Sequence, residues 1–457
     1  MASDGGGGCV GRRWLLVGSL ALVNFSAGFA FSCIAPFFPL EANNRGIGLG
    51  WVGVVFGVVK AASFLLSFPA GALINRVGAK LTIVCSYALL SVSVAAFGCL
   101  DVVTDGTLFV ALALLVRVIE AAGATGGTVG SYTLISLRLA DKSGTANAVI
   151  TIAFLAGMAT GPTMGAVLYG LGGFSLPFFA VAVPIALATA LILALAPVDQ
   201  QEHEGAKGKD VEKTDAGEPM SVWGLVKKAP LMLAVLGCEA TCIMALVYVD
   251  VTLEPFLRQF ELSSVTVGAL FMVPPAVFIV AGYPAGALAD RDSRGAFAIV
   301  VGTTVVTAFS LLGLGVAACL AVSDVALWTT VGALMAQGVG NCAVVAALAA
   351  LLSTVEKAGV SLDKRVASVV AVLHSAAQTL GGFAGATVGG VTAEWLGFEM
   401  SALANATPIF AAAIVLSALL LKGWLGRLLV ARKNSTASVE TTVSVVASLN
   451  GDPQCAA

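Results

Sequence analysis

The sequence predicts an all-α membrane protein with twelve transmembrane helices in two halves of six. Three observations carry this prediction: an apolar composition, a series of apolar segments long enough to cross a bilayer, and one polar interruption near the middle. The chain of 457 residues is 58% hydrophobic and only 11% charged, whereas soluble domains carry about 25% charged residues. A soluble protein this apolar could not cover its surface with polar groups, but a protein surrounded by lipid needs no such cover.

Twelve segments are long and apolar enough to form membrane-spanning helices. A helix needs about 20 mostly apolar residues to cross the hydrocarbon core, and its backbone must be hydrogen-bonded internally because lipid offers no partners. These segments lack the alternation of apolar and polar residues that marks a β-barrel strand. The predicted spans are 14–37, 51–74, 81–100, 107–132, 146–170, 174–196, 230–253, 265–289, 296–320, 326–352, 366–390 and 402–425.

A polar stretch divides the predicted spans into two equal sets. Residues 198–229 are rich in Glu, Lys, Asp and Gly, which predicts a flexible cytoplasmic linker between an N-terminal half, 14–197, and a C-terminal half, 230–425. We expect residues 1–13 to form a cytoplasmic N-terminus and residues 426–457 to form a disordered cytoplasmic tail. The first apolar segment is longer than the core of a signal peptide, so we expect it to be retained as a span.

The basic residues indicate which ends of the spans face the cytoplasm. Cytoplasmic loops of membrane proteins carry an excess of Lys and Arg. With twelve spans, one side of the membrane holds both termini, the linker and all but four of the 24 Lys and Arg residues. The exceptions are Arg45 and Arg258 in the opposite loops and Lys60 and Arg117 within spans. We therefore expect both termini to lie in the cytoplasm.

Composition also excludes several classes of function. The net charge of -2 gives no basic surface for nucleic acid. The nine cysteines include no Cys-x-x-Cys pair, so we interpret them as small packing residues and expect no metal site and no cofactor. The sequence has no Walker motif for ATP and no arrangement of nucleophile and base. Neither an ATP-driven pump nor an enzyme is therefore expected.

The two halves repeat one another in sequence. Residues 68–76, FPAGALINR, end the second predicted span, and residues 283–291, YPAGALADR, end the eighth, with six of nine positions identical. Duplicated halves of six spans are a recurrent architecture of secondary transporters, which hold the substrate near the membrane midplane between the halves. The repeat therefore predicts a transporter with a central site.

The loop at each repeated segment resembles the cytoplasmic loop signature of major facilitator transporters. Its glycine lets a span approach its neighbour closely, and its charges form a conformational latch in that superfamily. Asn75 stands where the signature has an acidic residue, which favours a weaker latch in the N-terminal half; the alternative is that Arg76 simply keeps the loop in the cytoplasm. The first copy comprises Gly71, Asn75, Arg76 and Gly78, and the second comprises Gly286, Asp290 and Arg291.

A motif in the fifth predicted span resembles the antiporter signature of drug-exporting major facilitators. Small residues four apart give a smooth face, which we expect to pack against the opposite half, and Pro162 bends the helix by removing a backbone hydrogen bond. The alternative is ordinary packing of small residues between neighbouring helices. The motif comprises Gly157, Gly161, Pro162 and Gly165.

Charged side chains within the spans are the strongest functional candidates, because each costs at least about 2.5–3.5 kcal/mol at membrane depth. Arg117 and Glu120 in the fourth span are three residues apart and share a helix face. Glu120 could neutralise Arg117, bind a proton or meet a cationic substrate, and the alternative is a static internal ion pair.

The seventh span carries two acids well inside the membrane. Glu239 and Asp250 are eleven residues apart, which at about 100° per residue places them on one face of a helix, about 16 Å apart along its axis. Such a column suits a cationic ligand better than an anionic one. Glu254 continues the same face, and we interpret it as a solvated helix end.

Other polar residues within the spans are weaker candidates. Lys60 could pair with an acid across the cavity. His374 is the only histidine within a predicted span and could titrate between a neutral cytosol and an acidic vesicle; a packed, hydrogen-bonded histidine is the alternative. The polar residues that could face the cavity are Asn24, Gln337, Asn341, Ser375 and Gln378.

Several segments, spread over most of the chain, together resemble the vesicular amine transporter family. The most specific is PFFPLEA at residues 36–42; others are LVRV at 115–118, VDVTL at 249–253 and WLGFE at 395–399. The resemblance implies the exchange of protons for a polyamine or a related amine, which is loaded into an acidic organelle. It also implies a role in proton coupling for Arg117.

Single positions both support and qualify this resemblance. Asp250 matches the acid of the family's seventh span, and Glu120 lies where the polyamine branch has an aspartate. Thr151 stands where that branch has a glutamate, and Asn24 and Ser375 stand where monoamine carriers have aspartates. The coupling and the substrate can therefore differ from those of the family.

The sequence thus favours a secondary active transporter that exchanges polyamines or related organic cations for protons by alternating access. We expect a monomer in a vesicle or another endomembrane, with a plasma-membrane location as the alternative. The rival functions are a multidrug/proton exporter of the same superfamily and a membrane sensor or scaffold that transports nothing. The expected substrate contacts are Asp250, Glu239, Glu120 and Asn24, and the expected groups for proton coupling are Arg117, Glu120, Asp250 and His374.

Overall fold

The structure is a computed structural model that describes residues 5–138, 143–195, 222–320, 322–360 and 364–449. Helices make up nearly all of this part of the chain, and no strand occurs in it. The predicted all-α class is therefore confirmed. Most of the predicted linker, 198–229, lies outside the described residues.

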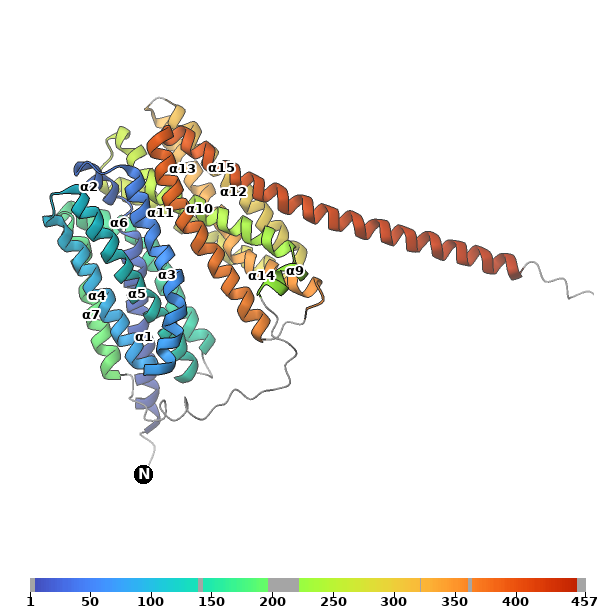
Figure 1. Ribbon diagram of the computed structural model, residues 1–457, viewed down its shortest axis with the longest axis horizontal. Coiled ribbons are helices and arrows are strands. Elements are labelled where there is room, and N and C mark those ends of the chain that lie inside the picture. The colour runs from blue at the N-terminus through green and yellow to red at the C-terminus, as the bar shows by residue number, and fades with distance from the viewer. Residues whose placement is uncertain (1–4, 139–142, 196–221, 321, 361–363, 450–457) are drawn as a thin grey trace, which may run out of the picture.

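The N-terminal half is a bundle of six long helices. A short helix, α2 (Phe38–Asn44), and a turn of 3-10 helix, η1 (Cys99–Val102), lie at one end of this bundle, where Arg45 Nε donates to the carbonyl of Val103 (Figure 1). We call this end the α2 end. The long helices are α1 (Gly5–Ser32), α3 (Leu49–Val77), α4 (Ala79–Gly98), α5 (Gly106–Arg138), α6 (Ser143–Gly172) and α7 (Ser175–Leu195).

The C-terminal half begins with a short helix, α9 (Val222–Lys228). Its longer helices are α10 (Leu231–Leu257), which runs into the turn η3 (Arg258–Phe260), then α11 (Ser264–Arg291), α12 (Ser293–Cys319), α13 (Asp324–Gly340), α14 (Cys342–Lys357) and α15 (Lys364–Leu449). The helices α13 and α14 meet at Asn341 and together form one candidate span.

The number of membrane crossings agrees with the prediction. Eleven segments of the described residues are long and apolar enough to cross a membrane, and the last, Val369–Lys422, has 54 residues, far more than one crossing needs. It belongs to α15, which is two helices joined at Gly397, where φ is 78° and ψ is 166°. Glycine adopts a positive φ at little cost because it has no Cβ. Counted as two, this segment brings the crossings to twelve.

Two stretches differ from the predicted boundaries. The helix α9 occupies the end of the predicted linker, because Leu225 and Val226 are buried in the apolar core of the C-terminal half. The helix α15 continues to Leu449 across the predicted disordered tail. No proline lies between Pro408 and Pro453 to end a helix there.

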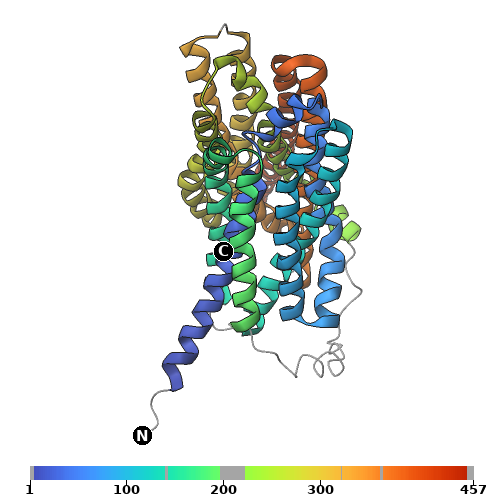
Figure 2. The same cartoon turned by 90° about the vertical axis from the view of Figure 1, so that its left-hand side faces the viewer.

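The two halves lie beside each other (Figures 1 and 2). Across the interface between them, α3 packs against α15 and α6 packs against α11. Within the N-terminal half α1 packs against α6, and within the C-terminal half α10 packs against α15. These are the first and fifth spans of each half, so the packing repeats as the repeated sequence predicts.

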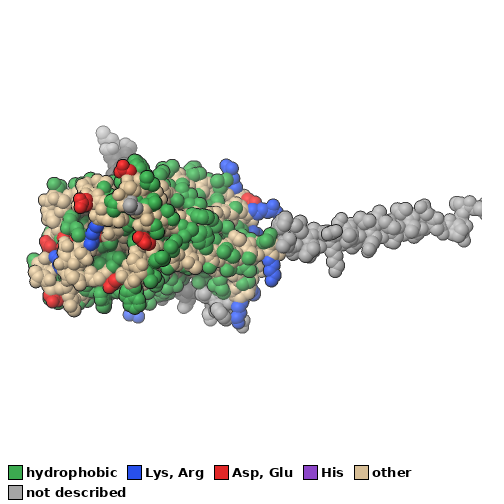
Figure 3. All heavy atoms as spheres, turned by 90° about the horizontal axis from the view of Figure 1, so that it is seen from above, with side chains coloured by type: hydrophobic (Ala, Val, Ile, Leu, Met, Phe, Trp, Pro, Cys, Tyr) green, Lys and Arg blue, Asp and Glu red, His purple; other side chains and the backbone are tan. Residues whose placement is uncertain are grey.

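Much of the outer surface is apolar. Leu187, Val280 and Trp328 are 66%, 77% and 72% exposed. Figure 3 shows hydrophobic side chains over broad areas of one face of the molecule, with few charged side chains among them. Such exposure suits hydrocarbon rather than water as the surrounding solvent.

Candidate functional site

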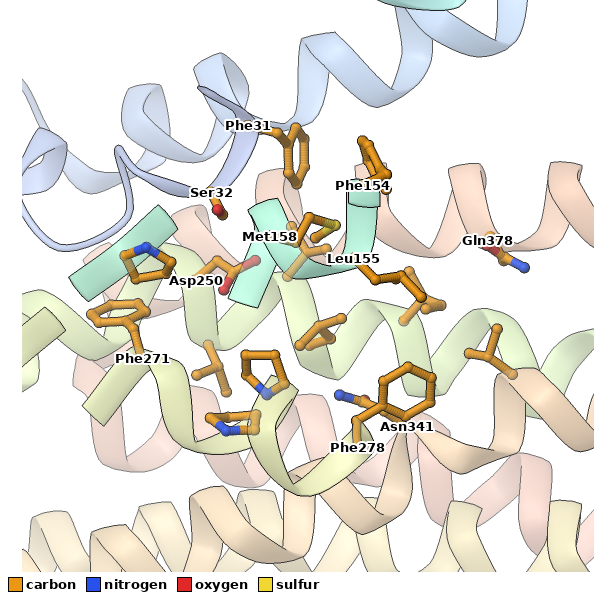
Figure 4. A pocket seen from close by; sticks show the side chains of 18 of the residues that line it. Phe31, Ser32, Phe154, Leu155, Met158, Asp250, Phe271, Phe278, Asn341 and Gln378 are labelled. Carbon is orange, nitrogen blue, oxygen red and sulfur yellow. The ribbon is translucent and has the colours of Figure 1, made fainter. Parts of the chain in front are cut away.

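A cavity of about 320 Å³ lies between the two halves. Its size falls within the range of about 300–1,000 Å³ that is typical of sites for small molecules. The helices α1, α3 and α6 line it from the N-terminal half, and α10, α11, α14 and α15 line it from the C-terminal half. Pro162 of α6 is one of the lining residues. Most of the wall is apolar, with Phe31, Phe154, Phe271 and Phe278 as its largest side chains (Figure 4).

Asp250 and Lys60 are the charged groups of this cavity. Among the described residues that line it, Asp250 is the only carboxylate and Lys60 is the only cation. Asp250 belongs to α10 and lies among the lining side chains in Figure 4, whereas Lys60 comes from α3 in the other half. The Nζ atom of Lys60 lies 4.0 Å from the centroid of the Phe31 ring, a cation–π contact. The two charges attract each other across the cavity.

Five uncharged polar residues complete the wall: Ser32, Thr379, Asn341, Ser375 and Gln378. Their hydroxyl and amide groups can form hydrogen bonds with a ligand. The last three were weak candidates from the sequence. Ser32 and Thr379 were missed, because a single hydroxyl side chain in an apolar span does not by itself show which way it faces.

The structure joins Glu239 and His374, which the sequence analysis treated separately. Glu239 is fully buried on α10, and its carboxylate oxygens lie 2.8 and 3.0 Å from Nδ1 of His374 on α15. Nε2 of Gln378 lies 3.0 Å from the same carboxylate and 2.9 Å from Nε2 of His374. Of these three, Gln378 lines the cavity. A direct contact of Glu239 with substrate therefore stays a prediction.

Arg117 and Glu120 form an ion pair inside the N-terminal half, away from the cavity wall. Nη1 of Arg117 donates to both carboxylate oxygens of Glu120, at 2.9 and 2.8 Å. The guanidinium carbon lies 4.4 Å from the centroid of the Phe97 ring. Both residues are buried, and Nε and Nη2 of Arg117 have no hydrogen-bond partner among the described residues. Their parts in proton coupling and substrate binding stay predictions.

We expect Arg117→Leu to lower the yield of folded protein severely, because it leaves the Glu120 carboxylate buried and unpaired, at a cost of about 3–5 kcal/mol. The double variant Arg117→Leu with Glu120→Leu should recover most of that yield, since no charge remains. Fluorescence-detected size-exclusion chromatography measures both. A double variant that folds as poorly as the single variant would contradict this account. Proton-driven uptake by the folded double variant then shows whether the pair also takes part in coupling.

Asn24 also faces the interior of the N-terminal half. Its Nδ2 donates to the carbonyl of Leu20 at 2.8 Å and to the hydroxyl of Tyr87 at 3.1 Å. Tyr87 in turn shares a hydrogen bond of 2.8 Å with Ser131. This network joins α1, α4 and α5, so the contact of Asn24 with substrate likewise stays a prediction.

The glycine motif of the fifth span packs within its own half. A Cβ added to Gly157, Gly161 or Gly165 would come within 2.0, 2.0 and 2.7 Å of atoms at the C-terminal end of α1 or just after it. The prediction that this face packs against the opposite half is wrong, because small residues permit a close approach without selecting which helix approaches. Contact with the opposite half comes instead from Thr163, whose hydroxyl donates to the carbonyl of Gly268 at 3.0 Å.

The loop motifs lie at the end of the bundle away from α2. Gly78, with φ of 88°, separates α3 from α4, and Gly286 of α11 lies against α14. Arg76 and Arg291 are exposed. The side chains of Asn75 and Asp290, and the surroundings of Gly71, lie outside the described residues, so the latch stays a prediction.

Sequence reasoning missed a polar cluster at the α2 end. Glu41 pairs with Arg45 and accepts a hydrogen bond from Tyr169 at 2.6 Å, and Arg45 lies 3.6 Å from Asp101. Phe37 stacks on Tyr169 with ring centroids 4.9 Å apart. The spacing of four residues between Glu41 and Arg45 on a helix was the signal that could have predicted their pairing.

The two halves are in close contact at the α2 end. A Cβ on Gly53 of α3 would lie 2.2 Å from the carbonyl oxygen of Ala386 on α15. Near it, the backbone N–H of Gly50 donates to Oε2 of Glu394 at 2.6 Å. The lack of a side chain on Gly53 therefore permits this contact between α3 and α15.

We expect Gly53→Ala to separate the halves at the α2 end, because its Cβ has no room beside the Ala386 carbonyl. Spin labels at the exposed positions Val102 and Trp395 should report a longer distance in this variant than in the wild type. Gly332→Ala is the matched control, since a Cβ there meets no atom within 4 Å. An unchanged distance distribution in Gly53→Ala would show that this contact does not hold the halves together.

Twelve crossings in two equivalent halves, with a cavity of ligand size between them, are the architecture of a secondary transporter. A family model agrees: the Major Facilitator Superfamily matches residues 20–322. The chain belongs to this superfamily.

Relatives and solved structures agree with this assignment. The chain is 25% identical over 388 residues to the MFS-type transporter SLC18B1 of Mus musculus. The aligned residues make up 84% of this chain and 81% of the mouse protein. The chain is 26% identical over 388 residues to the Homo sapiens protein of the same name, with the same coverage. The fold is similar to a bacterial homologue of the human lysosomal transporter Spinster in an inward-facing and occupied conformation, with a TM-score of 0.69 at 15% identity over 90% of this chain and 98% of that one. It is also similar to the nucleoside transporter NupG, with a TM-score of 0.66 at 15% identity over 89% and 99% of the two chains.

Proposed function

We propose that this transporter exchanges polyamines or related organic cations for protons by alternating access. The observation that carries the proposal is the place of Asp250, a carboxylate in a largely apolar cavity between the two halves. A carboxylate in such surroundings is costly unless a cation or a proton accompanies it. The site therefore suits a ligand of positive charge, and a proton and a cation compete for the same group.

Lys60 acts as an internal cation when the site is empty. It carries a primary ammonium on an alkyl chain, which is the chemistry that an alkylamine ligand offers. Because it faces Asp250 from the opposite wall, it offsets that charge in the absence of ligand. An amine that reaches Asp250 takes over this role from Lys60, whose ammonium lies on the Phe31 ring, 4.0 Å from its centroid.

The direction of exchange follows from the pH on the two sides. On an acidic side protons replace the amine at Asp250, and on a neutral side the proton leaves and the amine binds. This favours loading of amines into an acidic organelle, with both termini in the cytoplasm. The resemblance of several segments to the vesicular amine transporter family, and the similarity to the MFS-type transporter SLC18B1, support this proposal.

The second candidate is a multidrug/proton exporter at the plasma membrane. The aromatic wall formed by Phe31, Phe154, Phe271 and Phe278 favours it, because such a surface accepts apolar ligands of varied shape.

Uptake into proteoliposomes with an acidic interior distinguishes the two candidates. Labelled spermidine, labelled serotonin and a panel of cationic drugs are compared. We expect uptake of the alkylamine, with little for bulky drugs, whereas the exporter predicts the reverse order. The absence of any pH-driven cation uptake, or preferred uptake of organic anions, would contradict both.

A further inference from the structure

A cluster of three polar side chains beside the cavity takes no part in the exchange proposed at Asp250. Glu239 of α10 contacts His374 and Gln378, both from α15. Nε2 of Gln378 lies 2.9 Å from Nε2 of His374 and 3.0 Å from Oε1 of Glu239. An amide nitrogen carries two hydrogens and accepts none, so each of these neighbours must be an acceptor.

These contacts define the protonation state of the cluster in this conformation. Nε2 of His374 carries no hydrogen, because it accepts one from Gln378. The ring of a neutral imidazole then has its hydrogen on Nδ1, which donates to Glu239 at 2.8 Å. The opposite orientation of the amide would place its carbonyl oxygen against the carboxylate. The cluster therefore consists of a carboxylate and a neutral histidine, with one negative charge.

We propose that Glu239 and His374 form a proton-binding site separate from Asp250, and that Gln378 transmits its occupancy to the cavity. The added proton binds Nε2 of His374, the ring nitrogen that holds no hydrogen. The product is an imidazolium paired with the Glu239 carboxylate, so one proton takes the cluster from one negative charge to none. Glu239 is fully buried, whereas 18% of the His374 side chain is exposed.

Protonation changes what Gln378 offers to a ligand. Nε2 of His374 becomes a donor 2.9 Å from an amide nitrogen that is also a donor. The amide must then turn and present its carbonyl oxygen to the ring, where the hydrogen bond from the imidazolium offsets the closeness of that oxygen to the Glu239 carboxylate. Before the turn that oxygen belongs to the end of the amide opposite the one that contacts Glu239 and His374, and because Gln378 forms part of the wall, it can accept a hydrogen bond from an ammonium group in the cavity. After the turn the cavity has lost both this acceptor and the nearby negative charge.

A proton at His374 and a cation in the cavity therefore weaken each other's binding although they bind to different atoms. This coupling is reciprocal, since each ligand weakens the other by the same factor. The inference rests on the proposed exchange of organic cations, and it adds a second group at which a proton opposes the cation.

Among the described residues, few other titratable groups lie near the cluster. On α10 the neighbours are Cys238 and Cys242. The helices α12 and α14, which also pack against α10, carry charged residues only at their ends. The charged groups on the cavity side are Lys60 and Asp250.

The chain contains only two histidines, which permits a direct test. In a variant with His203→Asn, His374 is the single histidine, and its ¹⁵N signals in lipid nanodiscs show which ring nitrogen carries hydrogen. At alkaline pH we expect hydrogen on Nδ1 and none on Nε2, with Nε2 gaining one on acidification. Saturating spermidine should move this titration about one pH unit toward acid, equivalent to about tenfold weaker amine binding by the protonated form.

Two further variants test the part of Gln378. Gln378→Met keeps the length of the side chain without an amide, so His374 should still titrate but spermidine should move the titration less than in the wild type, by the effect of charge alone. Thr387→Val, further along the same helix and outside the cavity wall, should retain the shift. The inference would be overturned by hydrogen on Nε2 of His374 at alkaline pH, or by a spermidine-induced shift in Gln378→Met as large as that in the wild type. If the wild type binds no spermidine, both the proposed function and the coupling fail. The ¹⁵N signals of the His374 ring still show separately whether the proton site exists.

Discussion

Asp250→Asn should lower the uptake of organic cations by about a hundredfold or more while leaving the yield of folded protein unchanged. Asn keeps the volume of the side chain and removes the charge that would hold the cation. Loss of one partner from a buried ion pair costs about 3–5 kcal/mol, which corresponds to a factor of this size. Uptake of labelled spermidine into proteoliposomes, normalised to the amount of reconstituted protein, measures the effect.

The matched control for this experiment is Glu254→Gln. Glu254 lies four residues further along α10 and holds Arg258 through two hydrogen bonds of 2.8 Å, away from the cavity wall. The same change from carboxylate to amide should therefore leave cation uptake within a few-fold of the wild type. Wild-type uptake by Asp250→Asn, or an equal loss in both variants, would contradict the assignment of Asp250 to the substrate.

Lys60→Met should have the opposite effect on binding. If Lys60 offsets Asp250 in the empty site, its removal eliminates the internal competitor, and the affinity for spermidine at pH 8 should rise by about tenfold or more. Release of the amine on acidification should become slower, because the internal cation no longer replaces it. Equilibrium binding of labelled spermidine to the purified protein measures the first effect, and efflux after a pH jump measures the second.

Lys60→Arg controls for the loss of charge, since it keeps a cation on the same helix face and should leave the affinity near that of the wild type. A Lys60 that serves only to fill space would give the same affinity in all three proteins. A fall in affinity in Lys60→Met would show that Lys60 assists the ligand instead of competing with it.

The parts of the site that the sequence predicted are those set by local geometry. Arg117 and Glu120 are three residues apart on a helix, so their pairing follows from the helical repeat. The same repeat placed Asp250 and Glu239 on one face of α10. It could not show that one faces the cavity while the other meets His374, because that depends on how α15 packs against α10, 135 residues away in the chain.

Two other interpretations failed for reasons of packing. Glu254 was taken for a solvated helix end, but it is 4% exposed, because the neighbouring Arg258 pairs with it and covers it. The glycine face of α6 was assigned to the opposite half, but it packs against α1. Spacing predicts a smooth face or a pair of charges, whereas only the tertiary structure selects the partner helix.

The most direct test of the proposed exchange measures both ligands at once. Proteoliposomes with an acidic interior and an enclosed pH indicator are supplied with labelled spermidine, and amine entry and proton exit are recorded together. The account predicts that each rises with the other, that collapse of the pH gradient by an ionophore stops both, and that Asp250→Asn abolishes both. Spermidine uptake that continues unchanged without the gradient, or that moves no protons, would contradict it.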